Sequence, residues 1–98
     1  MRKLKSKEAE IIKNLLKIAG LQTDINELLV SPMSDGDMGS LAIGENYGSR
    51  QMGHEIAVYM FKDLDGTPVS AALNVDLQGN LYELDIWKVD FSSTQLLK

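Results

Sequence analysis

The stretch from 54 to 88, HEIAVYMFKDLDGTPVSAALNVDLQGNLYELDIWK, decides the fold of this chain. It contains three runs rich in β-branched and aromatic residues, at 54–62, 68–76 and 81–88. The dipeptides Asp65-Gly66 and Gln78-Gly79 separate the runs, and such dipeptides between alternating strands are typical of tight hairpin turns. The stretch therefore predicts three consecutive antiparallel strands.

Two-residue turns at these dipeptides would also fix the register of the strands. Leu64 would oppose Thr67 in the first hairpin, and Leu77 would oppose Asn80 in the second. One face of the sheet then carries three apolar rows, Ile56–Val75–Tyr82, Val58–Leu73–Leu84 and Met60–Ala71–Ile86. A sheet face that is apolar in every row has to be covered, so we expect a helix to pack on it.

The N-terminal region supplies that helix. Residues 7–19 have apolar side chains at helical spacing, after Ser6 as a candidate N-cap and before Gly20 as a candidate C-terminal residue. A short strand at 40–43 adds a fourth strand to the sheet, and Thr23 is expected to begin a short helical turn. The prediction is an α+β fold, in which an N-terminal helix packs on a four-stranded antiparallel meander sheet. We expect this two-layer, roll-like domain to span residues 1–98.

Composition narrows the classes of function. The chain has 98 residues and no cysteine, which excludes disulfides, thiol catalysis and zinc sites built on thiolates. Residues 1–20 carry six basic and two acidic side chains, whereas the remainder carries four basic and twelve acidic ones. Because the region after residue 20 is this acidic, it should repel phosphate backbones, and we do not expect nucleic acid as a partner. No apolar run is long enough for a signal peptide or a membrane span, so the expected location is the cytoplasm, without membrane association.

The face opposite the apolar rows carries the candidate site. At one end it is predicted to gather three aromatic side chains, and at the other end three acidic ones: Tyr59, Phe61 and Trp87, then Asp85, Glu83 and Asp76. Either a covering segment, the tail 89–97 or the 30–50 region, buries these aromatics, or they bind a protein partner. The leading hypothesis is a non-catalytic protein-interaction module, comparable to immunity-like or antitoxin-like proteins, with this acidic and aromatic face as its surface. A homodimer through an exposed sheet edge is also compatible with the pattern.

The alternative hypothesis is a small-ligand-binding domain. In this reading the glycine-rich segment 35–53 forms a lid, and Arg50 and His54 bind an anionic ligand. Residues 34–40 resemble a calcium-binding loop only superficially, because Asn46 stands where the bidentate glutamate is required. No metal or cofactor is expected. No nucleophile with a matching base is evident, so enzymatic activity is left uncertain, with non-enzyme preferred.

Two motifs carry a resemblance to a known family. The loop from Gly36 to Leu41, GDMGSL, and the run from Leu81 to Ser92, LYELDIWKVDFS, resemble a family of small uncharacterised bacterial proteins, a domain of unknown function. The likeness extends over nearly the whole chain, although the proline that often follows the closing motif is replaced here by Ser93. The resemblance implies a bacterial, stand-alone protein and supplies no activity.

Overall fold

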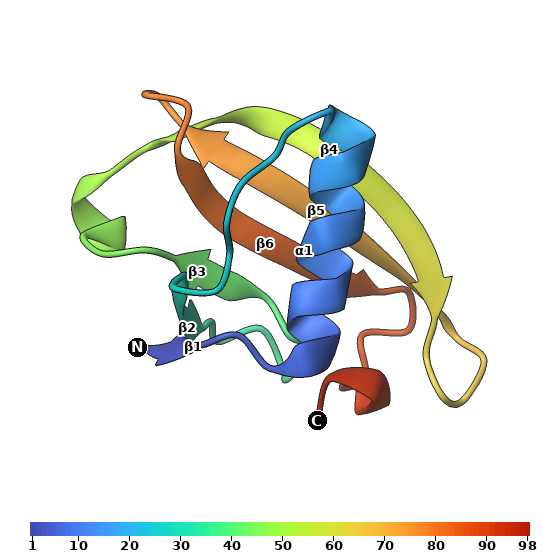
Figure 1. The fold of residues 1–98 in the computed structure, drawn as a ribbon. Helices are drawn as coiled ribbons and strands as arrows, with labels where there is room; N and C mark the ends of the chain where they lie inside the picture. Colours follow the sequence, from blue (N-terminus) through green and yellow to red (C-terminus); the bar gives the residue numbers. More distant parts are fainter.

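The computed structural model describes all 98 residues as one helix packed on a six-stranded sheet. The elements are β1 (Arg2–Lys3), α1 (Ser6–Ala19), β2 (Leu29–Pro32), β3 (Leu41–Ile43), the 3-10 turn η1 (Tyr47–Ser49), β4 (Met52–Lys62), β5 (Pro68–Asp76), β6 (Leu81–Lys88) and the 3-10 turn η2 (Gln95–Leu97). The strands lie in the order β1-β2-β3-β6-β5-β4, and every neighbouring pair is antiparallel (Figure 1).

The α+β class is confirmed, but the prediction of four strands is wrong. β1 was missed because it has only two residues, and β2 because it ends in Pro32, a residue that argues against an inner strand in the sequence. The helical turn predicted after Thr23 is reduced to a single hydrogen-bonded turn, in which the Leu28 N–H donates to the Ile25 carbonyl at 3.2 Å, and no helix forms there. Ile25 is instead buried in the core, and the chain continues into β2 beside β3.

The helix α1 begins one residue earlier than predicted. Ser6 is its first residue and not its N-cap, because Lys5 occupies the cap position. The Glu8 carboxylate accepts the Lys5 N–H at 2.8 Å, which satisfies a main-chain donor at the start of the helix. Gly20 ends the helix as predicted, in the left-handed conformation at φ 73°.

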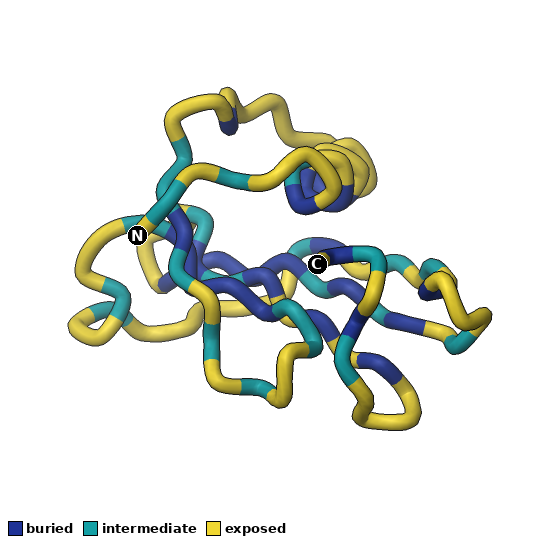
Figure 2. The backbone as a smooth tube through the Cα atoms, turned by 90° about the horizontal axis from the view of Figure 1, so that it is seen from below, coloured by how far each residue is buried: buried dark blue, intermediate teal, exposed yellow.

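The helix covers one side of the sheet, here called the inner face. Its buried side chains are Glu8, Ile11, Ile12, Leu15 and Leu16. The apolar ones join the core cluster formed with β5 and β6, whereas Ile18 is exposed. Figure 2 shows the two layers, with the buried side of the helix turned toward the sheet and the opposite side of the helix in water. No second layer of helix or strand covers the opposite side of the sheet, called the outer face, although Tyr47 of η1 bonds to Glu83 at one end of it, where Asn74 is buried.

The predicted register of the first hairpin is wrong by one residue. Asp63 N–H donates to the Thr67 carbonyl at 2.9 Å, so the loop contains three residues, 64–66, and not two. Gly66 adopts φ 82°, the left-handed position that such a three-residue loop requires. Each residue of β4 from Ala57 to Lys62 therefore meets a partner one position away from the predicted one. Because side chains alternate along a strand, this part of β4 is turned over.

The second hairpin keeps its predicted register along most of its length. Its loop also has three residues, 77–79, since Asp76 N–H donates to the Asn80 carbonyl at 2.8 Å. A β-bulge then places one extra residue, Tyr82, between the pairs Val75–Leu81 and Asn74–Glu83. The bulge cancels the shift introduced by the loop, so the remaining pairs of β5 and β6 match the prediction.

Candidate functional site

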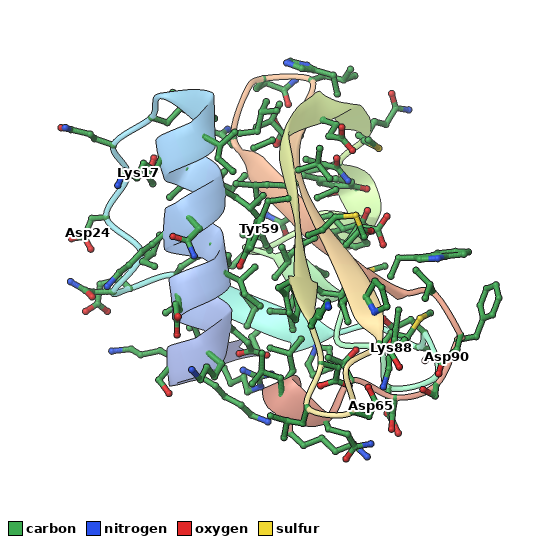
Figure 3. All side chains as sticks on the ribbon, turned by 90° about the vertical axis from the view of Figure 1, so that its right-hand side faces the viewer. Lys17, Asp24, Tyr59, Asp65, Lys88 and Asp90 are labelled. Carbon is green, nitrogen blue, oxygen red and sulfur yellow. The ribbon has the colours of Figure 1, made fainter.

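The corrected register separates the three aromatics that were predicted to share a face. Tyr59 and Phe61 point to the inner face, where both pack against the core with their ring centroids 5.9 Å apart. Figure 3 shows Tyr59 between α1 and the sheet. Trp87 remains on the outer face and is 47% exposed. The prediction of one aromatic cluster on the outer face is therefore wrong, and Trp87 is the member that it places correctly.

In place of the lost aromatics, β4 brings two aliphatic side chains to the outer face. Val58 is 48% exposed and Met60 is 60% exposed. Met60 lies in one row with Ser70 and Trp87, and Val58 lies in the next row with Ala72 and Asp85. The small side chains on β5 thus separate apolar groups on the two neighbouring strands.

The C-terminal tail adds one more aromatic beside Trp87. The rings of Phe91 and Trp87 meet edge to face, with their centroids 5.0 Å apart, and Phe91 is 64% exposed. Beyond Phe91 the tail turns away from the outer face, and Leu97 is buried in the core next to α1. The predicted covering segment does not bury Trp87. We call Val58, Met60, Trp87 and Phe91 the outer apolar strip.

Acidic side chains lie next to this strip. Burial raises the pKa of Asp85, and the nearby charges of Glu83 and Asp35 raise it further, while a hydrogen bond from the Ser40 hydroxyl at 3.4 Å opposes the rise. Glu83 accepts a hydrogen bond from the Tyr47 hydroxyl at 2.7 Å. The part of this rise that comes from Glu83 and Asp35 reflects neighbouring negative charges, which favour a cation at this position.

Asp76 is not available to a partner. It lies at the end of β5, is almost fully buried and accepts hydrogen bonds from the N–H groups of Gln78 and Asn80 at 2.9 and 3.0 Å. Burial would raise its pKa, but these hydrogen bonds and the nearby Arg50 lower it. The carboxylate is therefore an internal anion that organises the second hairpin loop.

Arg50 is used in the same place. Its guanidinium bonds to Asp76 at 3.1 Å, donates to the carbonyls of Leu81 and Ile43, and lies 5.2 Å from the ring centroid of Tyr82. His54 pairs with Val75 in the sheet, and its exposed side chain makes no hydrogen bond or ion pair. No cavity of the structure is lined by either Arg50 or His54. The structure therefore does not bring these two residues together around a ligand site.

A second buried ion cluster lies at the opposite end of the meander. Lys88 Nζ is 2.7 Å from Asp63 and 2.8 Å from Asp65, and it donates to the Ser93 carbonyl at 3.2 Å. Lys88 and Asp63 are 1% and 0% exposed, and Figure 3 shows Lys88 beside Asp65. The hydrogen bonds that Lys88 donates to Asp63 and Asp65 raise the pKa of Lys88. The two ends of this cluster carry only weak sequence signals: Asp63 precedes the first glycine turn, and Lys88 lies within the run from Leu81 to Ser92.

The structure also has a cleft of about 440 Å³ near both chain ends. It lies between the start of α1, the segment 32–41 and the tail, and its lining includes Arg2, Lys5, Asp35, Asp37, Thr94 and Lys98. The Thr94 hydroxyl is buried and has no hydrogen-bond partner.

No cluster of three or more His, Asp or Glu side chains suited to a metal ion occurs. The one helix of the structure is too short and too polar to cross a membrane.

Comparison with known families gives one match. A family model described as a domain of unknown function, DUF6984, matches residues 1–98. The chain belongs to the DUF6984 family. No curated protein and no solved structure matches it significantly. The interpretation of this DUF6984 chain therefore depends on its own geometry.

Proposed function

We propose that the chain is a non-catalytic protein-interaction module that binds a protein partner through its outer face. The carrying observation is the outer apolar strip, whose four side chains are 47% to 64% exposed on a face without a second layer. Exposed apolar groups gathered on one face, with polar side chains beside them, are typical of interaction sites on soluble proteins. Trp87 is the expected anchor, because tryptophan is enriched among residues whose truncation costs most binding energy.

The acidic side chains beside the strip indicate the character of the partner. Asp85 is exposed and stands in the same row as Val58, with Glu83 in the next row on β6. The excess negative charge there favours a partner that presents lysine or arginine next to an apolar group. Charges at the rim of an interface mainly accelerate association, so we expect binding to weaken as salt rises.

Matched variants test the proposal in two steps. Wild type and Trp87→Ala are used as affinity baits at low salt, with Ile18→Ala as a control that removes an equally exposed apolar side chain from α1. A partner that is retained by wild type and by the control but lost with Trp87→Ala is then titrated by calorimetry. We expect Trp87→Ala to weaken binding by about thirtyfold or more. If no protein distinguishes wild type from Trp87→Ala, the outer face is not the binding surface.

Asp85→Lys tests the electrostatic part of the proposal. It should slow association and reverse the salt dependence, while Trp87→Ala should mainly accelerate dissociation. Glu27→Lys, an exposed charge change away from the outer face, is the control. An unchanged association rate in Asp85→Lys would contradict the assignment of a basic partner.

A second candidate function, small-ligand binding, is supported by the 440 Å³ cleft, one of whose lining residues, Thr94, has a buried hydroxyl without a hydrogen-bond partner. A cleft of this volume falls in the range of small-molecule sites, and it is lined by the first part of the glycine-rich segment. Fragment screening by NMR tests it. Ligands should shift the amides of Thr94 and Ser40, and Thr94→Val should remove the effect. The absence of such shifts at millimolar fragment concentration contradicts this candidate.

A further inference from the structure

The two edges of the sheet differ sharply in length. β1 closes one edge with two residues, whereas β4 forms the other edge with eleven residues and nothing pairs beyond it. Figure 1 shows β4 as the outermost strand of the meander. An exposed edge strand presents unpaired N–H and C=O groups, which are a template for another strand.

The register identifies which groups of β4 are free. Asp63 and Thr67 form a hydrogen-bonded pair, and hydrogen-bonded pairs alternate along an antiparallel ladder. Phe61, Tyr59 and Ala57 therefore bond to β5. The main-chain groups of Val58, Met60 and Lys62 point to the open edge.

This part of the edge lacks the usual protection against pairing. Natural edges are commonly shielded by proline, by inward charges or by β-bulges. The two bulges of β4, at Gly53 and Ile56, lie toward its start. From Ala57 to Phe61 the edge is regular, contains neither proline nor a charge, and displays the exposed Val58 and Met60.

We propose that a second copy of this chain pairs with β4, antiparallel and with the two-fold axis beside Tyr59. In this register Val58 of one copy faces Met60 of the other, in both directions. Their side chains extend the outer apolar strip across the axis. The two sheets join into one continuous sheet, and the two outer faces lie on the same side of it.

Charge complementarity selects this register. The bulge lets Ile56 and Ala57 share one position, so Glu55 becomes the next residue whose main chain points to the open edge. With the axis beside Tyr59, Glu55 faces Lys62 of the second copy, and symmetry repeats the contact. Both side chains are exposed, and neither has a hydrogen bond or ion pair within its own chain.

Neighbouring registers lose this match. An axis beside Val58 places Glu55 opposite Met60, and an axis beside Met60 places Lys62 opposite Val58. Only the register about Tyr59 combines opposite charges at the ends with apolar contacts in the middle. One strand pair is a small interface, so we expect an equilibrium that depends on concentration.

Sedimentation velocity between about 10 µM and 1 mM tests the proposal in the range expected for a small interface. The mass of the wild type should rise from 10.8 kDa toward twice that value. Glu55→Lys and Lys62→Glu should each raise the dissociation constant about tenfold, because each creates two like-charge contacts. The double variant E55K/K62E restores both ion pairs and should return to within about threefold of wild type. Glu45→Lys and Lys13→Glu, which change exposed charges elsewhere, are the matched controls.

Hydrogen exchange gives a second readout at single residues. The amides of Val58 and Met60 should become protected as the concentration rises, while the amide of Tyr59, already bonded to β5, should not change. A wild type that stays monomeric at 1 mM overturns the proposal and leaves the edge to a strand from another protein. A dimer that the charge swap does not restore overturns the register. Both results are independent of the outer-face proposal. That proposal is tested with Trp87→Ala, which leaves the main chain of β4 intact and should not change the dimer.

Discussion

Two buried aspartates at opposite ends of the meander do the same local task in different ways. Asp63 follows β4 and Asp76 ends β5, and each precedes a three-residue loop with a left-handed glycine. Each carboxylate also holds a distant cation, Lys88 for Asp63 and Arg50 for Asp76. The hairpin loops are therefore joined to the rest of the chain by ion pairs.

The difference lies in what each aspartate holds in place. Asp63 accepts N–H groups from Leu64 and from two tail residues, Gln95 and Leu96, each at 2.8 Å. It therefore fixes the tail as well as its own loop. The main-chain N–H groups that Asp76 accepts come only from its own hairpin, at Gln78 and Asn80, and its link to a distant segment is the guanidinium of Arg50. A carboxylate that joins three segments should matter more than one that joins two.

Asp63→Ala tests this ranking and has the largest expected effect. The substitution leaves the buried Lys88 with only the half-exposed carboxylate of Asp65 as an ion-pair partner, and it removes the acceptor of three main-chain N–H groups. We expect a loss of about 3–5 kcal/mol in the free energy of unfolding, measured in urea. Asp76→Ala is the comparison and Glu45→Ala is the surface control. A smaller loss for Asp63→Ala than for Asp76→Ala would reverse the ranking.

Lys88→Met separates the cation from the carboxylate. Burial raises the pKa of Asp63, but Lys88 and the three N–H donors lower it well below its usual range. The stabilisation is therefore present above the unfolded pKa of about 4 and is lost as the pH falls through the folded value. Without Lys88 the folded pKa rises, so acid unfolding should begin at a higher pH.

Circular dichroism along an acid titration measures this shift, with Lys62→Met as the control. We expect Lys88→Met to reduce stability at pH 7 less than Asp63→Ala does, because Asp63 keeps its N–H donors. An acid transition at the wild-type pH would show that Lys88 does not set the ionisation of Asp63.

Arg50→Lys tests the other end of the meander. The guanidinium joins Asp76, two carbonyls and the face of Tyr82, and an ammonium group cannot reproduce this planar arrangement. We expect a loss of about 1–2 kcal/mol and faster hydrogen exchange in residues 44–51. Stability equal to wild type would mean that charge alone is sufficient there. Lys62→Arg, on the exposed edge, is the reciprocal control.

The positions of the two hairpin turns could be predicted from the sequence, but the length of each loop could not. The glycine dipeptides located both turns. Which side chains of a strand point inward, however, depends on whether the loop has two or three residues. Alternation along the strands cannot distinguish these loop lengths, because a β-bulge can cancel the difference. In β4 the choice was ambiguous, because Val58 and Met60 are as apolar as Tyr59 and Phe61. Leu73 and Leu84 were placed correctly only because Tyr82 bulges.

The ion clusters were beyond sequence reasoning for a different reason. Asp63 and Lys88 are 25 residues apart, and although alternation with Leu84 and Ile86 places Lys88 on the inner face, nothing in the local sequence indicates Asp63 as its partner. An aspartate before a glycine turn is ordinary, and so is a lysine at the end of a strand. Only the fold reveals that the tail returns to the first hairpin loop and encloses both.

Asp85→Asn has the smallest expected effect and contrasts with both buried aspartates. The pKa of Asp85 is raised by burial and by Glu83, so the folded state binds a proton more readily than the unfolded state. Its contribution to stability therefore falls as the pH rises through the unfolded and folded pKa values. At pH 7 the neutral amide should stabilise the chain by about 0.5 kcal/mol or less, since water screens this exposed position. Urea unfolding at pH 7 and pH 3 measures the difference, which should vanish at pH 3. A loss of stability at pH 7 would show that Asp85, like Asp63 and Asp76, is held by favourable contacts, and it would weaken its assignment as an unsatisfied charge awaiting a basic partner.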